Sequence, residues 1–186
     1  MHSLPTSAVL AIATALACGA AQAQTSPYVG QESREIKALS PQEVDDLLNA
    51  RGMALAKAAE LNGYPGPAHT LEWTAELKLS QDQVRSIREI KDRLDAAAKP
   101  LGAQIVTRER DLDRRFASGG ITEPEIASET KAIGDLQGRL RSLHLAAHLA
   151  TKAKLDAGQI ARYNQLRGYG AAAEPTAHDP AKRHGN

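Results

Sequence analysis

Two long amphipathic stretches separated by a short glycine turn constrain the fold of this chain more than any other feature. Apolar residues recur at steps of three and four through residues 84–116 and again through residues 136–150, which is the spacing of one helical face. The turn Ser118-Gly119-Gly120 lies between them. Two long helices joined by so short a turn form an antiparallel hairpin, so we expect an all-α fold with long helices over about 81–116 and 121–154.

Pro100 is expected to kink the first of these helices. A proline inside a helix removes one backbone hydrogen bond and bends the axis, so the bend should lie near residues 96–99. The second helix is apolar almost all round from 143 to 150, because Leu145 and Leu149 lie away from its main stripe. We expect other elements to cover it from more than one direction. The residues expected to be buried on the first helix are Val84, Ile87, Leu94, Leu101, Ile105, Leu112 and Phe116.

Shorter helices are expected to flank the hairpin, over about 40–62, 68–77 and 157–166. The first begins with a Ser cap, a Pro and a Glu three residues after the cap, which is the pattern of a capping box. Gly52 should weaken its middle by about 1 kcal/mol relative to alanine. Residues 24–39 show little periodicity and are expected to be a flexible lead-in. The Ala- and Pro-rich tail, 170–186, is expected to be disordered.

The N-terminal residues 1–23 resemble a secretory signal peptide. The apolar run from Ala8 to Cys18 is shorter than the roughly 20 residues that span a bilayer, and Ala21-Gln22-Ala23 is a small-x-small cleavage signal. We therefore expect export to the periplasm. Lipoprotein processing at Cys18 is the alternative, but the residue three before the cysteine is Ala, which makes a poor lipidation signal.

Charge and composition exclude several classes of function. The chain of 186 residues carries 23 basic and 22 acidic residues, whereas a nucleic-acid binder needs a basic surplus on one face. Cleavage of the signal would remove the only cysteine, and the sequence has neither a glycine-rich phosphate loop after a strand nor a Gly-x-Ser-x-Gly elbow. We therefore expect no enzymatic activity, no nucleic-acid partner and no required cofactor.

Two of the predicted helix starts share one pattern and carry a family resemblance. Each has an aliphatic residue, a capping side chain and, three positions after the cap, a glutamine that can reach back to the cap. The two copies are Leu79, Ser80 and Gln83, and Leu155, Asp156 and Gln159. They resemble the Leu-Thr-x-x-Gln motif that occurs twice in the CpxP/Spy family of periplasmic proteins, whose relatives include CnrX-type and ZraP-type heavy-metal resistance proteins. Ser80 and Asp156 replace the family's threonine but keep the capping chemistry.

The resemblance covers roughly residues 50–169 and implies a helical CpxP/Spy-like domain, which we place at 40–169. It implies an envelope-stress protein that binds unfolded or misfolded periplasmic proteins as an ATP-independent chaperone. It also implies a membrane stress sensor as a further partner. A thin hairpin cannot bury both of its faces within one chain, so we expect a homodimer.

The alternative function is a heavy-metal sensor or buffer of the CnrX or ZraP type, binding Zn, Ni or Co. His144 and His148 are four residues apart on one helix, so their side chains can meet, and imidazole is a preferred ligand of these metals. Two further ligands would be needed. His69 and Glu72, on the short helix before the first motif, are the candidates if that helix packs on the open end of the hairpin.

Overall fold

The computed structural model describes residues 25–169, and all regular secondary structure in that part of the chain is helical, without any strand. This confirms the predicted all-α class. The predicted signal, 1–23, and the predicted disordered tail, 170–186, lie outside the described residues. Residues 25–32 belong to a separate N-terminal unit and run through turns, whereas the unit that begins at Ser33 contains all of the helices. The helices are α1 (Pro41–Leu48), α2 (Lys57–Glu60), α3 (Pro67–Glu72), α4 (Gln81–Ala117), α5 (Glu123–Lys152) and α6 (Ala157–Leu166).

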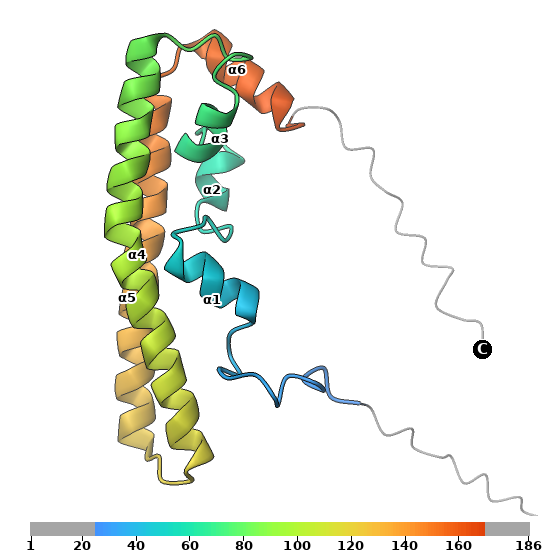
Figure 1. The fold of residues 1–186 in the computed structure, drawn as a ribbon, viewed down its shortest axis with the longest axis vertical. Coiled ribbons are helices and arrows are strands. Elements are labelled where there is room, and N and C mark those ends of the chain that lie inside the picture. Colours follow the sequence, from blue (N-terminus) through green and yellow to red (C-terminus); the bar gives the residue numbers. More distant parts are fainter. Residues whose placement is uncertain (1–24, 170–186) are drawn as a thin grey trace, which may run out of the picture. The chain divides into compact units, whose positions relative to one another are not determined.

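The two long helices form the predicted antiparallel hairpin, with α4 and α5 side by side along most of their length (Figure 1). The turn between them needs a left-handed residue, and Gly119 occupies that position with φ of 71°. Near the turn, Arg115 pairs with Glu125 across the two helices at 2.8 Å, and Arg108 pairs with Glu129 at 2.8 Å. Partway along its length the axis of α4 changes direction (Figure 1), as expected of a helix that contains Pro100.

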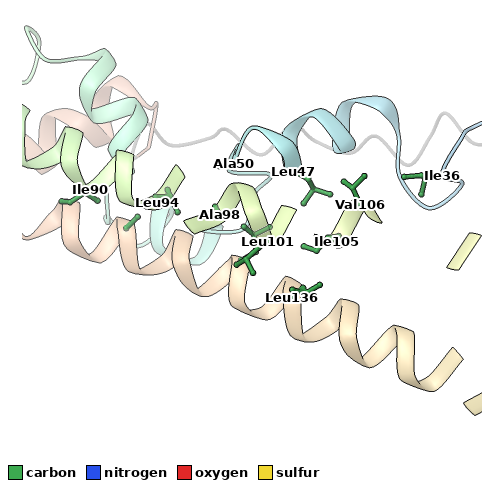
Figure 2. Close-up of a cluster of buried hydrophobic side chains, with 12 residues drawn as sticks. Ile36, Leu47, Ala50, Ile90, Leu94, Ala98, Leu101, Ile105, Val106 and Leu136 are labelled. Atoms are coloured by element: carbon green, nitrogen blue, oxygen red, sulfur yellow. The ribbon is translucent and has the colours of Figure 1, made fainter. Parts of the chain in front are cut away.

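A single apolar cluster joins the hairpin to the elements that precede it (Figure 2). Leu94, Leu101 and Ile105 of α4 face Leu136 and Leu140 of α5 in this cluster. Helix α1 packs against α4, and α2 and α3 follow it along the hairpin (Figure 1). The short helices therefore cover one side of the hairpin from within the same chain.

Two of the residues expected to be buried are in fact exposed. Phe116 lies at the turn end of α4, beyond the short helices, and 55% of its surface is exposed. The segment 143–150 is also not covered on all sides, because Leu149 remains 61% exposed on α5. Both corrections have one physical reason: the short helices cover one side of the hairpin only.

The helix predicted over 40–62 is two helices, α1 and α2, separated by an irregular segment. Helix α1 ends at Leu48. In the segment that follows, the Arg51 guanidinium pairs with Asp45 and Asp46 of α1. Ala50, Met53 and Ala54 adopt left-handed backbone conformations with φ of 55°, 43° and 58°. We call residues 49–54 the strap. The third short helix is also shorter than predicted, because α3 spans Pro67–Glu72 and the chain then runs in turns to Lys78.

A close approach of backbone to backbone holds α1 against α4. A methyl group added at Gly102 of α4 would lie 2.0 Å from the carbonyl oxygen of Leu47 in α1. Only glycine therefore lets these two helices come this close. Beyond α1, the end of the predicted lead-in also contributes to the fold. Ile36, which is 3% exposed, belongs to the apolar cluster, and Lys37 pairs with Asp113 of α4 at 3.1 Å.

Candidate functional site

The two motif copies meet at the open end of the hairpin, where α4 begins and α5 leads into α6. Each copy is a complete capping box, since the Ser80 hydroxyl accepts from the Gln83 N–H at 3.2 Å and the Asp156 carboxylate accepts from the Gln159 N–H at 2.8 Å. The two glutamine side chains also bond to each other. Gln83 Nε2 donates to Gln159 Oε1 at 2.8 Å, and Gln159 Nε2 donates to Gln83 Oε1 at 3.1 Å.

The same two side-chain amides also donate hydrogen bonds to neighbouring backbone carbonyls. Gln83 Nε2 also donates to the Lys154 carbonyl at 2.8 Å, and Gln159 Nε2 donates to the Leu77 carbonyl at 3.3 Å. The glutamines thus serve both as cap partners and as a bridge that closes the open end. Sequence reasoning identified the capping and missed the bridge, because a spacing of three within each copy gives no sign of a contact between copies.

Beside this closed end, all four predicted metal ligands line one hollow of about 400 Å³. Helix α3 contributes His69 and Glu72, and α5 contributes His144 and His148. The condition on which His69 and Glu72 were proposed, that their helix packs near the histidines of the hairpin, is met in this arrangement, and the metal site itself stays a prediction. We call this the histidine hollow, and its other lining residues are Asn49, Ala50, Arg51, Gly52, Gly66, Pro67, Ala68, Lys91, Leu94 and Asp95.

His144 is the most unusual group of this hollow. It is 4% exposed, and its Nε2 atom is buried without a hydrogen-bond partner among the described residues. Burial lowers the pKa of the His144 imidazole below its ordinary value, and the nearby His148 lowers it further, while the carboxylate of Asp95 acts in the opposite direction. His144 is therefore a neutral imidazole near pH 7.

His148 is held from two sides. Its Nδ1 donates a hydrogen bond to the Tyr64 carbonyl at 2.7 Å, and because a carbonyl oxygen can only accept, Nδ1 carries the proton. The opposite edge of the ring rests on Gly66, where an added methyl group would lie 2.8 Å from Cε1 and 2.9 Å from Nε2. The ring thus links α5 to the segment that leads into α3.

Metal binding was tested against this geometry. A metal-bound histidine commonly donates its other ring N–H to a carbonyl, and His148 does so. However, no group of three or more His, Cys, Asp or Glu side chains within residues 25–169 is arranged to hold a metal ion. His69 Nδ1 is engaged with Glu72 at 3.0 Å. Metal binding by these four residues remains a prediction.

A second hollow, of about 460 Å³, lies next to the first and shares Gly52, His69 and His148 with it. We call it the Glu60 hollow. Its remaining lining residues are Met53, Ala54, Ala56, Lys57, Glu60, Leu61, Arg167 and Tyr169. The two hollows therefore lie on the side of the hairpin that carries the strap, and strap residues line both of them.

Glu60 is a buried carboxylate that anchors the C-terminal helix. Its Oε1 accepts from the Tyr163 hydroxyl at 2.7 Å, from Arg167 Nε at 2.9 Å and from the Tyr169 hydroxyl at 3.2 Å. Its Oε2 lies 3.5 Å from His148 Nδ1. Burial raises the pKa of the Tyr163 hydroxyl, and its hydrogen bond to Glu60 raises it further. Tyr163 thus stays protonated and donates to Glu60.

Sequence reasoning missed Glu60 as a site residue. It precedes the Asn62–Pro67 turn and reads as an ordinary polar residue at a helix end. Its partners are more than 100 positions away in the chain, and no local pattern reports such a distance. The sequence indicates only weakly that Tyr163 belongs to the site. It is one of only four tyrosines, and it lies in the helix that follows the second motif.

The fold and the two hollows together define the class of the molecule: an all-helical hairpin protein whose short N-terminal helices enclose a histidine-lined concavity. No family model matches the chain, and neither a curated protein nor a solved structure is similar enough to count as a match. Among residues 25–169, no helix has both the length and the apolar character needed to cross a bilayer.

Proposed function

We propose that this protein is an exported, ATP-independent chaperone that binds unfolded polypeptide segments along the two hollows. The observation that carries the proposal is the pair of adjacent hollows on one side of the hairpin, joined through Gly52, His69 and His148. Leu94 and Pro67 line one hollow, and Met53 and Leu61 line the other. Side chains of this kind offer apolar contact without a catalytic group, which suits transient binding of exposed apolar segments.

The charged side chains around the hollows are largely paired. Arg51, Lys57, Lys91 and Arg167 line the hollows together with Glu60, Glu72 and Asp95. Arg167 pairs with Glu60, Lys91 pairs with Asp95, and Arg51 pairs with Asp45 and Asp46. The contact that the hollows offer to a client is therefore mainly apolar.

The proposal is tested by suppression of aggregation. A chemically reduced client protein should stay in solution when an equimolar amount of this protein is added. Replacing Ala68, an exposed residue of the histidine hollow, by tryptophan should fill the hollow and reduce suppression. The matched control is Ala97→Trp on α4, an exposed alanine that lines neither hollow. No suppression by the unaltered protein at stoichiometric amounts would rule the proposal out.

A second candidate function, binding of Zn, Ni or Co, is favoured by a specific observation. The four residues proposed as ligands from the sequence, His69, Glu72, His144 and His148, line the same hollow. A bound metal would supply positive charge, and these imidazoles and the carboxylate would hold it. Binding of this kind would suit a metal sensor or buffer and would require no catalytic group.

Calorimetry distinguishes the two candidates. Because His178 and His184 lie in the C-terminal tail, both are first replaced by alanine so that they add no background binding. Titration of this protein with Ni, Co and Zn is then repeated with His144→Ala. A loss of tenfold or more in metal affinity on adding His144→Ala supports a metal site in the histidine hollow. Equal affinity with and without His144→Ala rules that site out.

A further inference from the structure

The strap, residues 49–54, holds an unusual concentration of backbone strain. Ala50, Met53 and Ala54 all have φ between 43° and 58°, a left-handed region that residues with a Cβ atom disfavour. Gly52, the one strap residue that would tolerate this conformation freely, is not among the positive-φ residues, and a methyl group added to it would meet nothing within 4 Å. Strained non-glycine residues persist only where the surroundings impose them.

The strap is held at its two ends and by Met53, which packs partly buried against the apolar cluster. Ala50 is buried in the apolar cluster, and the Arg51 N–H donates to the Asp46 carbonyl at 2.9 Å. The amides of Gly52, Met53 and Ala54 donate no hydrogen bond to any residue of the described part of the chain. The Arg51 ion pairs with Asp45 and Asp46 are half-exposed, and such pairs contribute little stability.

The position of the strap gives this strain a role. Arg51 lines the histidine hollow, Ala54 lines the Glu60 hollow, and Gly52 lines both. The middle of the strap is thus part of the partition between the two hollows. Displacing it would join them into one groove and would release the left-handed conformations at Met53 and Ala54.

We propose that the strap is a strained gate whose opening joins the two hollows into a single groove for an extended, apolar polypeptide segment. The choice of occupant rests on the proposed chaperone function and on the apolar lining residues described above, whereas the gate itself rests on the backbone. The closed strap already carries this backbone strain, and opening releases it. Opening therefore costs less free energy than it would from an unstrained closed strap.

The test relieves the strain and removes a single methyl group from the lining of the Glu60 hollow. In Ala54→Gly the closed strap loses its strain at that position, because glycine adopts the left-handed conformation freely. We expect the melting temperature to rise by about 2–4 °C. Hydrogen exchange of the strap amides should slow, and a fluorescent peptide rich in apolar residues should bind several-fold more weakly, because the closed state is favoured.

Two control variants separate the gate from a general gain in stability. Lys78 is also left-handed, with φ of 49°, but lines neither hollow, so Lys78→Gly should raise the melting temperature and leave both peptide binding and strap exchange unchanged. Gly52→Ala adds a methyl group into open space at ordinary φ and should leave strap exchange within twofold of the unaltered protein.

Each outcome decides the proposal. Slower strap exchange in Ala54→Gly alone among these variants supports the gate, and weaker peptide binding in the same variant supports its role in client access. The gate is overturned if the strap amides of the unaltered protein exchange as slowly as the amides of α4. It is also overturned if the strap amides exchange at the same rate in Ala54→Gly and in the unaltered protein. If the unaltered protein binds no peptide, the chaperone function fails, while the exchange data still decide whether the gate exists.

Discussion

At the scale of single residues, the burial of His144 costs folding free energy that no hydrogen bond to its Nε2 atom offsets. A buried polar atom without a partner destabilises a fold by about 1–3 kcal/mol, and Nε2 of His144 has none among the described residues. The groups that face the ring are His148 on the same helix and Asp95 with Lys91 on α4. An apolar side chain of similar size would suit this position better if packing alone mattered.

Replacement of His144 by leucine is therefore expected to raise the free energy of unfolding at pH 7.5 by about 1 kcal/mol. The measurement is urea denaturation followed by circular dichroism. The matched control is His69→Leu, since His69 is partly exposed on α3 and its replacement should change stability by less than about 0.5 kcal/mol. A clear loss of stability in His144→Leu would show that the ring makes a favourable contact in the folded state.

The same residue predicts how stability depends on pH. The pKa of His144 is lowered in the folded state from its ordinary value of 6.5, so the unfolded chain takes up this proton more readily. Stability is then complete above pH 6.5 and falls as the pH drops through the lowered value. Denaturation at pH 5.0, 6.0 and 7.5 should show this loss in the unaltered protein. A His144→Leu variant with the same pH dependence would contradict the assignment.

At the scale of elements, the contact of α1 with α4 depends on one glycine. In Gly102→Ala the new methyl group would meet the Leu47 carbonyl, which is backbone and cannot rotate away as a side chain can. We expect a loss of about 1–3 kcal/mol in the free energy of unfolding. Gly134→Ala on α5 is the control, because nothing lies within 4 Å of its added methyl group, and it should stabilise the helix by up to about 1 kcal/mol.

The sequence predicted the two long helices and α6 well and the short N-terminal helices poorly. Periodicity over some 30 residues, the Gly119 turn and the capping boxes at Ser80 and Asp156 are local signals, and they located α4, α5 and α6 closely. The break after Leu48 was missed, because no local pattern indicates the left-handed backbone of Ala50, Met53 and Ala54. Helix formers such as Ala54 and Leu55 made a continuous helix the better local prediction.

At the scale of the whole molecule, the candidate site could be predicted in part. The spacing of four on one helix brings His144 and His148 together, and His69 and Glu72, which were candidates only if their helix packed nearby, line the same hollow. Glu60 and the bridge between Gln83 and Gln159 could not be predicted, because each joins residues more than 70 positions apart. The strap was also missed, since left-handed conformations at alanine and methionine oppose local preference.

The glutamine bridge makes a whole-molecule prediction that a double-mutant cycle can check. Gln83→Ala and Gln159→Ala should each destabilise the fold, and the two effects should couple by about 0.5–1.5 kcal/mol, the range of a buried hydrogen-bond pair. Gln83→Ala combined with Glu43→Ala is the matched control. Glu43 completes the capping box of α1 and has no contact with Gln83, so that pair should be additive within about 0.5 kcal/mol.

The bridge has a consequence for the order in which the molecule assembles. Gln83 and Gln159 are 76 positions apart, so their amides can meet only after the intervening chain has doubled back from the Gly119 turn. We expect a contact that closes so large a loop to form late in folding, after the rate-limiting step. Its free energy should then act on the lifetime of the native state, by slowing the first separation of the two long helices, with little effect on the rate of folding.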